Sequence, residues 1–312
     1  MTFLLFPSDH PLKQGLGALS ITCAVLLLSL SDALVKLNNQ SFALGQLLLI
    51  RSLVAMGLLM ALLLACQTFQ SGFSIRAFLV AHKRPWLWAR SMCLALMWGC
   101  YYASLPFLSF SLAAACYYTA PVWMAILSSV LLGRRMRGRE ILAIILGLCG
   151  VMTILRPGLE NVSIAAILPL LAGFLYALAA IITSRHLKQV PALVVAINLN
   201  LVIASTAAVS VAGLMYFGPE HQASFLLSAW SSVDWNGGLL LIGLGGLLAI
   251  ITFLVAVAYQ SSPAPIIGLF DNGYLAFAIL WGILLFEDWP DLIACLGVML
   301  IGAGALLASA RQ

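Results

Sequence analysis

Charged side chains are scarce in this 312-residue chain: 8% of its residues are Asp, Glu, Lys or Arg, whereas 63% are hydrophobic. A soluble domain carries about 25% charged residues, so this chain lacks the polar surface that a soluble fold needs. Its long apolar runs, separated by short polar connections, predict an all-α integral membrane protein. The net charge of +5 is spread over the connections, which indicates orientation in the membrane rather than nucleic-acid binding.

Several signatures of chemical function are also missing. The seven cysteines lie mostly inside apolar runs with no CxxC spacing, which is typical of small packing residues. The four histidines lie far apart in polar connections, so no metal-ligand cluster is predicted and no cofactor is expected. HExxH and GxSxG motifs are absent. An intramembrane enzyme is therefore disfavoured, and no enzymatic activity is expected.

Ten apolar segments of about 20 residues are long enough to cross the hydrocarbon core as helices. They are placed at residues 15–37, 42–65, 86–107, 110–132, 139–156, 162–183, 192–215, 237–259, 264–286 and 291–310. Proline removes a backbone N–H, so bends are predicted at Pro121 and Pro169. The Pro121 bend is either purely structural or part of a site. Small residues at helical spacing predict two close packing faces: Ala143, Gly147 and Gly150 in the fifth segment, and Gly243 and Gly246 in the eighth.

Two hairpins, residues 112–155 and 266–310, share one layout of an apolar run, a short charged break and a second apolar run. The break is basic in the first hairpin, at residues 133–139, and acidic in the second, at residues 287–291. Since Lys and Arg collect on the cytoplasmic side, the two hairpins are predicted to point to opposite sides. Two inverted five-helix repeats are therefore predicted, residues 1–156 and 157–312, an organisation typical of transporters.

The distribution of basic residues orients the chain. With a cytoplasmic N-terminus, the outside connections hold only Arg156. The inside connections and tails hold eleven basic residues: Lys13, Arg76, Lys83, Arg84, Arg134, Arg135, Arg137, Arg139, Arg185, Lys188 and Arg311. Both termini are therefore predicted to be cytoplasmic.

Four charged side chains stand out inside the predicted spans: Asp32, Lys36, Arg51 and Asp271. A charge at the helix centre costs about 2.5–3.5 kcal/mol on insertion scales, so it normally faces the interior and has a partner or a function. Two interpretations are open. Asp32 and Lys36, one turn apart, form a structural pair while Arg51 bonds to carbonyls. Alternatively, Arg51 holds a substrate anion and Asp32 a substrate cation.

Asp271 is the predicted proton-coupling residue, with Asp32 as the next carboxylate. No basic residue lies within a turn of Asp271. Burial disfavours the charged form of a carboxylate, and intramembrane acids serve as proton relays in transporters. The competing interpretation is that Asp271 opens to a wet cytoplasmic vestibule and caps a neighbouring helix.

Aromatic residues near these charges are either packing surfaces or walls of a ligand site. Trp98, Tyr101 and Tyr102 share one face of the third segment, where the two tyrosines are alternatively interface-belt residues. Tyr117 and Trp123 flank Pro121. The full predicted substrate-binding set is Asp32, Lys36, Arg51, Trp98, Tyr101, Tyr102, Tyr117, Trp123, Asn272 and Tyr274.

Several short stretches carry a family resemblance: Thr119-Ala-Pro-Val-Trp-Met, Leu131-Leu-Gly-Arg-Arg, Gly147-Leu-Cys-Gly-Val, Leu284-Leu-Phe-Glu-Asp-Trp-Pro-Asp, Gly297-Val-Met-Leu-Ile-Gly, Ser31-Asp-Ala-Leu-Val-Lys and Leu49-Ile-Arg-Ser-Leu. Taken together, they resemble EamA-type ten-helix members of the drug/metabolite transporter superfamily. The chain departs from that pattern at Arg134, where an acidic residue is usual, and in lacking a proline opposite Pro121. The resemblance implies a central cavity between two halves, alternating access, and secondary transport across a bacterial inner membrane.

The combined interpretation is a secondary active transporter of a small polar metabolite, an amino-acid-like compound or derivative, that works as an exporter. An importer of a riboflavin- or S-adenosylmethionine-like vitamin or cofactor is the alternative. From another class, a pore or a membrane assembly protein is the alternative. The expected partners are a small-molecule substrate, the lipid bilayer and protons as a coupling ion, without nucleic acid. The protein is expected to be a monomer or a homodimer.

Overall fold

The computed structural model describes residues 11–69, 83–132, 138–155, 164–187, 190–217, 225–261, 270–271 and 273–309. These residues are mostly helical and include no strand. Among them, five helices are long and apolar enough to cross a membrane: Gly15–Leu37, Leu44–Ala65, Ile164–Thr183, Leu193–Phe217 and Trp235–Val255. Shorter apolar helices follow at Gly273–Phe286 and Leu292–Gly304. The prediction of an all-α chain with membrane-spanning segments is confirmed.

Helices occur at all ten predicted segments. In chain order they are α1 (Pro11–Leu37), α2 (Leu44–Phe69), α4 (Pro85–Ser104), α5 (Phe110–Tyr117), α6 (Ala120–Leu132), α7 (Gly138–Leu155), α8 (Ile167–His186), α9 (Ala192–Phe217), α10 (Trp235–Ser261), α12 (Gly273–Phe286) and α13 (Leu292–Ser309). The fourth segment thus contains two helices, α5 and α6, and a short 3-10 turn, Ile164–Ala166, precedes α8.

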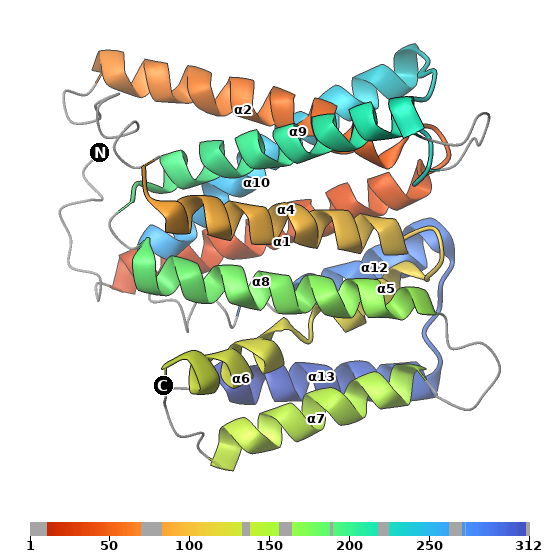
Figure 1. Cartoon of the computed structure of the whole chain (residues 1–312). Helices are drawn as coiled ribbons and strands as arrows, with labels where there is room; N and C mark the ends of the chain where they lie inside the picture. The colour runs from red at the N-terminus through yellow and green to blue at the C-terminus, as the bar shows by residue number, and fades with distance from the viewer. Residues whose placement is uncertain are drawn as a thin grey trace.

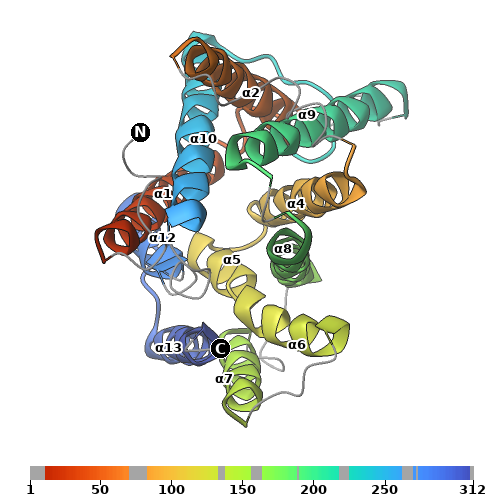
Figure 2. The same ribbon diagram turned by 90° about the vertical axis from the view of Figure 1, so that its left-hand side faces the viewer.

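The helices form three tiers when they are viewed from one end (Figure 2). α2, α9 and α10 form one outer tier and pack on one another, and α6, α7 and α13 form the other. α1, α12, α5, α4 and α8 lie between them (Figure 2). The most extensive pairings join helices far apart in sequence, such as α7 with α13, α4 with α8 and α1 with α10. The site described below lies where α1, α2, α4, α5 and α12 meet.

The Pro121 bend is a complete break between α5 and α6. Tyr118 and Thr119 form a turn, and the Thr119 carbonyl accepts from the backbone N–H groups of Val122 and Trp123 to begin α6. Gly173 of α8 lies directly against the break: a Cβ atom there would be 2.6 Å from the Tyr117 carbonyl oxygen. Glycine at this position therefore lets the backbone of α8 approach the end of α5.

Pro169 lies in the first turn of α8, two residues after its start. The first N–H groups of a helix have no intrahelical acceptor, so a proline there removes no helical hydrogen bond. The predicted bend at Pro169 inside the sixth segment is therefore wrong, because Pro169 lies at the beginning of α8.

Small residues on α7 do allow close packing, as predicted. A Cβ atom on Gly150 would be 2.7 Å from the carbonyl oxygen of Gly297 and 2.9 Å from the backbone nitrogen of Ile301, both on α13. A Cβ atom on Gly147 would overlap a methyl group of Val122 on α6. The backbones of α7 and α13 are therefore in direct contact, which small residues make possible.

The predicted glycine face of the eighth segment is wrong. A Cβ atom on Gly243 or Gly246 would meet nothing within 4 Å. The close approach is at Gly245, where a Cβ atom would be 2.6 Å from Val54 and 3.0 Å from the carbonyl oxygen of Arg51. α10 therefore packs on α2 through the neighbouring face, next to the buried arginine.

Large apolar side chains cover the outward faces of the outer helices. On α7 the exposed ones are Ile141, Leu142, Ile145, Leu148 and Met152. On α13 they are Leu292, Ile293, Leu296, Met299 and Leu306. A water-soluble monomer rarely exposes such extensive apolar surface, so these faces suit contact with lipid.

Candidate functional site

Asp32 and Arg51 are buried charged side chains on two helices that follow each other in the chain, α1 and α2. Asp32 is 2% exposed and Arg51 is 0% exposed. Among the described residues, Arg51 is also one of the largest fully buried side chains. A buried charge needs partners or a function, and the surrounding tyrosines supply the partners.

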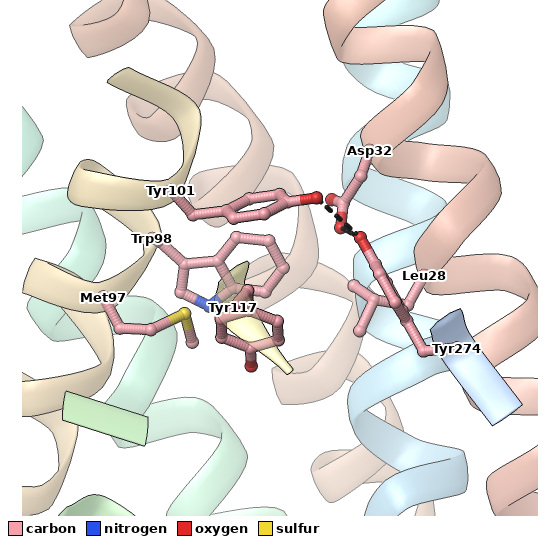
Figure 3. Close-up of a pocket in the computed structure, with 7 residues that line it drawn as sticks. All are labelled: Leu28, Asp32, Met97, Trp98, Tyr101, Tyr117 and Tyr274. Atoms are coloured by element: carbon pink, nitrogen blue, oxygen red, sulfur yellow. Dashed lines mark hydrogen bonds between the residues drawn. The ribbon is translucent and has the colours of Figure 1, made fainter. Parts of the chain in front are cut away.

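A chain of hydrogen bonds joins the arginine to the carboxylate. Arg51 Nη1 donates to Tyr102 Oη, and Tyr102 Oη donates to Asp32 Oδ1 over 2.7 Å. The second carboxylate oxygen, Oδ2, accepts from Tyr274 Oη over 2.6 Å. Tyr101 Oη lies 2.9 Å from Tyr274 Oη. The hydroxyls of Tyr101 and Tyr274 and the Asp32 carboxylate point toward one another (Figure 3).

The chemistry of the groups fixes the direction of this chain. A guanidinium has donors and no acceptor, so Tyr102 Oη accepts from Arg51 and directs its own hydrogen to Asp32. With Tyr274 donating as well, both oxygens of the Asp32 carboxylate act as acceptors. Tyr102 is therefore a neutral bridge between a cation and an anion, and the bridge connects α1, α2 and α4.

Aromatic rings lie against the guanidinium of Arg51. Its Cζ is 4.5 Å from the ring centroid of Trp98 and 5.0 Å from that of Tyr102, within the range of cation–π attraction. Nε and Nη2, on the other edge of the group, are buried and have no hydrogen-bond partner among the residues that the structure describes. The arginine is thus held by one of its nitrogens and by the rings, while two donor nitrogens remain unsatisfied.

A small cavity of about 20 Å³ adjoins the carboxylate (Figure 3). This volume is enough for about one water molecule. The lining residues are Leu28, Asp32, Met97, Trp98, Tyr101, Tyr117 and Tyr274. The structure is therefore closed around Asp32, within a wall that is mostly aromatic.

Asp271 lies close to the same aromatic wall but has different partners. Its Oδ2 accepts from Tyr176 Oη of α8 over 3.1 Å, and its backbone carbonyl accepts from Tyr118 Oη over 3.2 Å. The Tyr118 ring stacks on the Tyr274 ring, with centroids 4.9 Å apart. Tyr274 bonds to Asp32, so the surroundings of the two carboxylates meet at this pair of rings. Asp271 is half-buried, in contrast to Asp32.

The structure brings together most of the predicted substrate-binding residues and places three elsewhere. Asp32, Arg51, Trp98, Tyr101, Tyr102, Tyr117 and Tyr274 form the cluster and its cavity. Lys36 instead donates from Nζ to the carbonyls of Leu105, over 2.9 Å, and Leu108, just beyond α4. Trp123 packs edge-to-face on Phe174 of α8 at 5.5 Å, and Asn272 lies outside the described residues.

Asp32 and Lys36, which form a pair in the structural interpretation, are not hydrogen-bond partners of each other. Asp32 accepts from tyrosines, and the Lys36 ammonium lies at backbone carbonyls after the end of α4. Arg51, in turn, donates to a hydroxyl rather than to the carbonyls of the structural interpretation. Lys36 is therefore placed to hold the C-terminal ends of α1 and α4 together.

Tyr118 and Tyr176 are the contacts that the sequence-based set omits. A tyrosine inside an apolar segment needs a partner for its hydroxyl, and this requirement was the only indication in the sequence that Tyr118 and Tyr176 belong to the site. The acceptor at Asp271 could be assigned only once the packing of α5 and α8 near the start of α12 was known.

Comparisons with known proteins agree with this architecture. Residues 15–156 match the model of the EamA-like transporter family. Two proteins of Helicobacter pylori, each described as an uncharacterized transporter, are similar over nearly the full length. The protein of strain J99 is 26% identical over 302 residues, and that of strain 26695 is 25% identical over 303 residues. Each match covers 93% of this chain and 93% of the relative.

A solved crystal structure of a protein has the same fold, with a TM-score of 0.62 at 16% sequence identity. The match covers 95% of this chain and 96% of that one. The resemblance carried by the sequence motifs is thus confirmed: residues 15–156 of this multi-pass membrane protein are similar to the EamA-like transporter family, and the chain is similar to the two Helicobacter pylori proteins over nearly its full length.

Proposed function

We propose that the protein is a secondary active transporter that exports a small polar, amino-acid-like metabolite across a bacterial inner membrane by alternating access around Asp32. The observation that carries the proposal is the buried chain Asp32–Tyr102–Arg51, set in an aromatic wall at the meeting point of several helices. Charges in a bilayer are costly and mark substrate or ion pathways. A purely structural role would leave two buried donors of Arg51 unexplained.

The packing of the helices supports two inverted five-helix repeats, residues 1–156 and 157–312. In this arrangement the first repeat consists of α1, α2, α4, α5 with α6, and α7. Their counterparts in the second repeat, in order, are α8, α9, α10, α12 and α13. The helix contacts made by the first repeat then match those made by the second. α1 packs on α10 as α8 packs on α4, and α1 packs on α12 as α8 packs on α5 and α6. α2 packs on its own counterpart α9, and α7 on α13. Rocking of two such repeats about a central site is the usual mode of alternating access.

The positions of the helix ends support ten spans with both termini cytoplasmic. Four helix termini lie at the same end of the bundle (Figure 1): the first residues of α1 and α4 and the last residues of α8 and α13. Lys83 and Arg84, just before α4, and Arg185, near the end of α8, lie at that end. With this end cytoplasmic, Asp32 is five residues from the outer end of α1, so the hydrogen-bonded cluster closes the outer side.

Asp271 is the proposed proton-coupling group, with Asp32 as the second carboxylate. Tyr176 is the one side-chain donor to Asp271 among the described residues, and this, with the partial exposure of Asp271, suits a group that exchanges a proton with the cytoplasmic side. Its position one turn before Tyr274 allows a change at Asp271 to move the tyrosine that bonds to Asp32.

Two linked measurements test the proposal. Thermal unfolding of the detergent-purified protein in the presence of metabolite pools identifies a ligand, since a compound that binds only the native state stabilises it. Labelled ligand is then offered to proteoliposomes that contain an excess of the unlabelled compound. We expect protein-dependent exchange of label into the vesicles. A ligand that binds but does not exchange would overturn the transporter and favour a membrane assembly protein.

A further inference from the structure

We propose that the Nε–Nη2 edge of Arg51 is a carboxylate-binding position, and that Arg51 and Asp32 together select a zwitterionic substrate. This inference rests on the proposed transport function and adds the charge class of the substrate. It requires that the ligand carry a carboxylate for Arg51 and an ammonium for Asp32.

The Nε–Nη2 edge of the Arg51 guanidinium indicates where a carboxylate would bind. Nη1 bonds to Tyr102, whereas Nε and Nη2 are buried and no residue in the described part of the chain is their hydrogen-bond partner. Leaving buried donors of a charged group unsatisfied is costly. The parallel N–H groups of one guanidinium edge match the two oxygens of a carboxylate. A carboxylate there would satisfy both donors at once.

The balance of charge between Arg51 and Asp32 indicates that the substrate is a zwitterion. Arg51 and Asp32 are linked through a single tyrosine hydroxyl, and together they make a buried site with no net charge. An added anion or cation alone would leave an uncompensated charge at membrane depth, which is unfavourable. A zwitterion adds two opposite charges and keeps the site neutral.

The surroundings of Asp32 suit the ammonium group. Tyr102 and Tyr274 donate to its two oxygens, in the positions where an ammonium would donate. The aromatic rings of Trp98 and Tyr117 line the adjoining cavity, and such rings attract cations. The cavity of about 20 Å³ is too small for an amino acid, so binding requires the tyrosine hydroxyls to move off the carboxylate.

The test uses pairs of compounds in which one charged group is blocked and the other is kept. Each of the twenty common L-amino acids is added to the purified full-length protein, and thermal stability is measured. The most stabilising amino acid is then compared with its methyl ester, which lacks the carboxylate, and its N-acetyl derivative, which lacks the ammonium. We expect each derivative to bind about tenfold more weakly or worse, the effect of losing a hydrogen bond to a charged group.

Two variants assign the charges to residues. In Arg51→Gln, the amino acid and its methyl ester should bind with similar affinity, while the N-acetyl derivative remains weaker. In Asp32→Asn, the amino acid and its N-acetyl derivative should bind with similar affinity, while the methyl ester remains weaker. Arg51→Lys keeps the charge without the planar edge and should bind the amino acid more weakly than the parent. Size-exclusion profiles and unliganded melting curves show that each variant is folded.

The outcomes separate this inference from the transport function. If the methyl ester loses as much affinity in Arg51→Gln as in the parent protein, Arg51 does not bind the carboxylate. Stabilisation by an uncharged or singly charged metabolite, or by no zwitterion at all, overturns the zwitterion class but leaves transport intact. A zwitterion that binds as described and is not exchanged in proteoliposomes overturns transport while leaving the charge assignment.

Discussion

Tyr102→Phe is expected to destabilise the protein far more than the neighbouring change Tyr101→Phe. Both side chains are buried on α4, and both substitutions keep the ring and remove one hydroxyl. The hydroxyls differ in their partners. Tyr102 bonds to Arg51 and Asp32, which are both charged, whereas Tyr101 bonds to the hydroxyl of Tyr274.

The expected magnitudes follow from these partners. A hydrogen bond to a charged group contributes roughly 1.5–3 kcal/mol, and one between neutral groups about 1 kcal/mol. Tyr102→Phe breaks two of the first kind and leaves a buried cation and a buried anion each short of a partner. We therefore expect it to lower the free energy of unfolding by about 3 kcal/mol or more. Tyr101→Phe should lower it by about 1 kcal/mol.

The assay is reversible unfolding of both variants and the parent in mixed micelles, with the same denaturant series. A third variant, Tyr102→Phe with Arg51→Gln, removes the charge that the first change leaves unpaired. It should be less destabilised than the sum of its two single changes. Equal losses for the two tyrosine variants, or simple additivity in the double variant, would refute the bridging role of Tyr102.

Three further predictions concern packing, coupling and topology. Gly150→Ala should destabilise the protein by about 1–3 kcal/mol, the usual cost of overpacking, because its Cβ meets the α13 backbone. In the same unfolding assay Gly302→Ala, with open space around it, should be near neutral. Asp271→Asn should still exchange labelled for unlabelled substrate in proteoliposomes but fail to accumulate it under a pH gradient; accumulation at the parent rate would exclude Asp271 from coupling. Single cysteines replacing Arg137 and Asp288 should differ on intact cells, with an impermeant thiol reagent labelling only position 288. Equal labelling would contradict the inverted arrangement.

The helices were predictable because hydropathy alone decides where a chain can cross a bilayer. The apolar segments and the close-packing face of α7 followed from composition and from the spacing of small residues. The packing face of α10 did not, because a glycine-rich stretch such as 243–246 offers more than one face to a neighbour. Its contact at Gly245 depends on where α2 lies.

The candidate site was predictable in its charges and less so in its pairings. Asp32 and Arg51 stood out because intramembrane charges are rare. Local spacing favoured Lys36 as the partner of Asp32, but α4 and α12 bring tyrosines to that carboxylate from 70 and 242 residues away in the chain. Such contacts are decided by tertiary packing, which one sequence does not reveal.

Alternating access around Asp32 is tested most directly by the reactivity of a cysteine at Leu28, which lines the cavity. The change is made in a cysteine-free background, and an impermeant thiol reagent is applied to right-side-out and to inside-out vesicles. Tyr274→Phe removes one hydroxyl that bonds to Asp32, in the cluster that closes the outer side under the proposed orientation. The account predicts that this change raises labelling of position 28 from outside and lowers labelling from inside. A rise from both sides together, or reactivity from one side in every case, would contradict it.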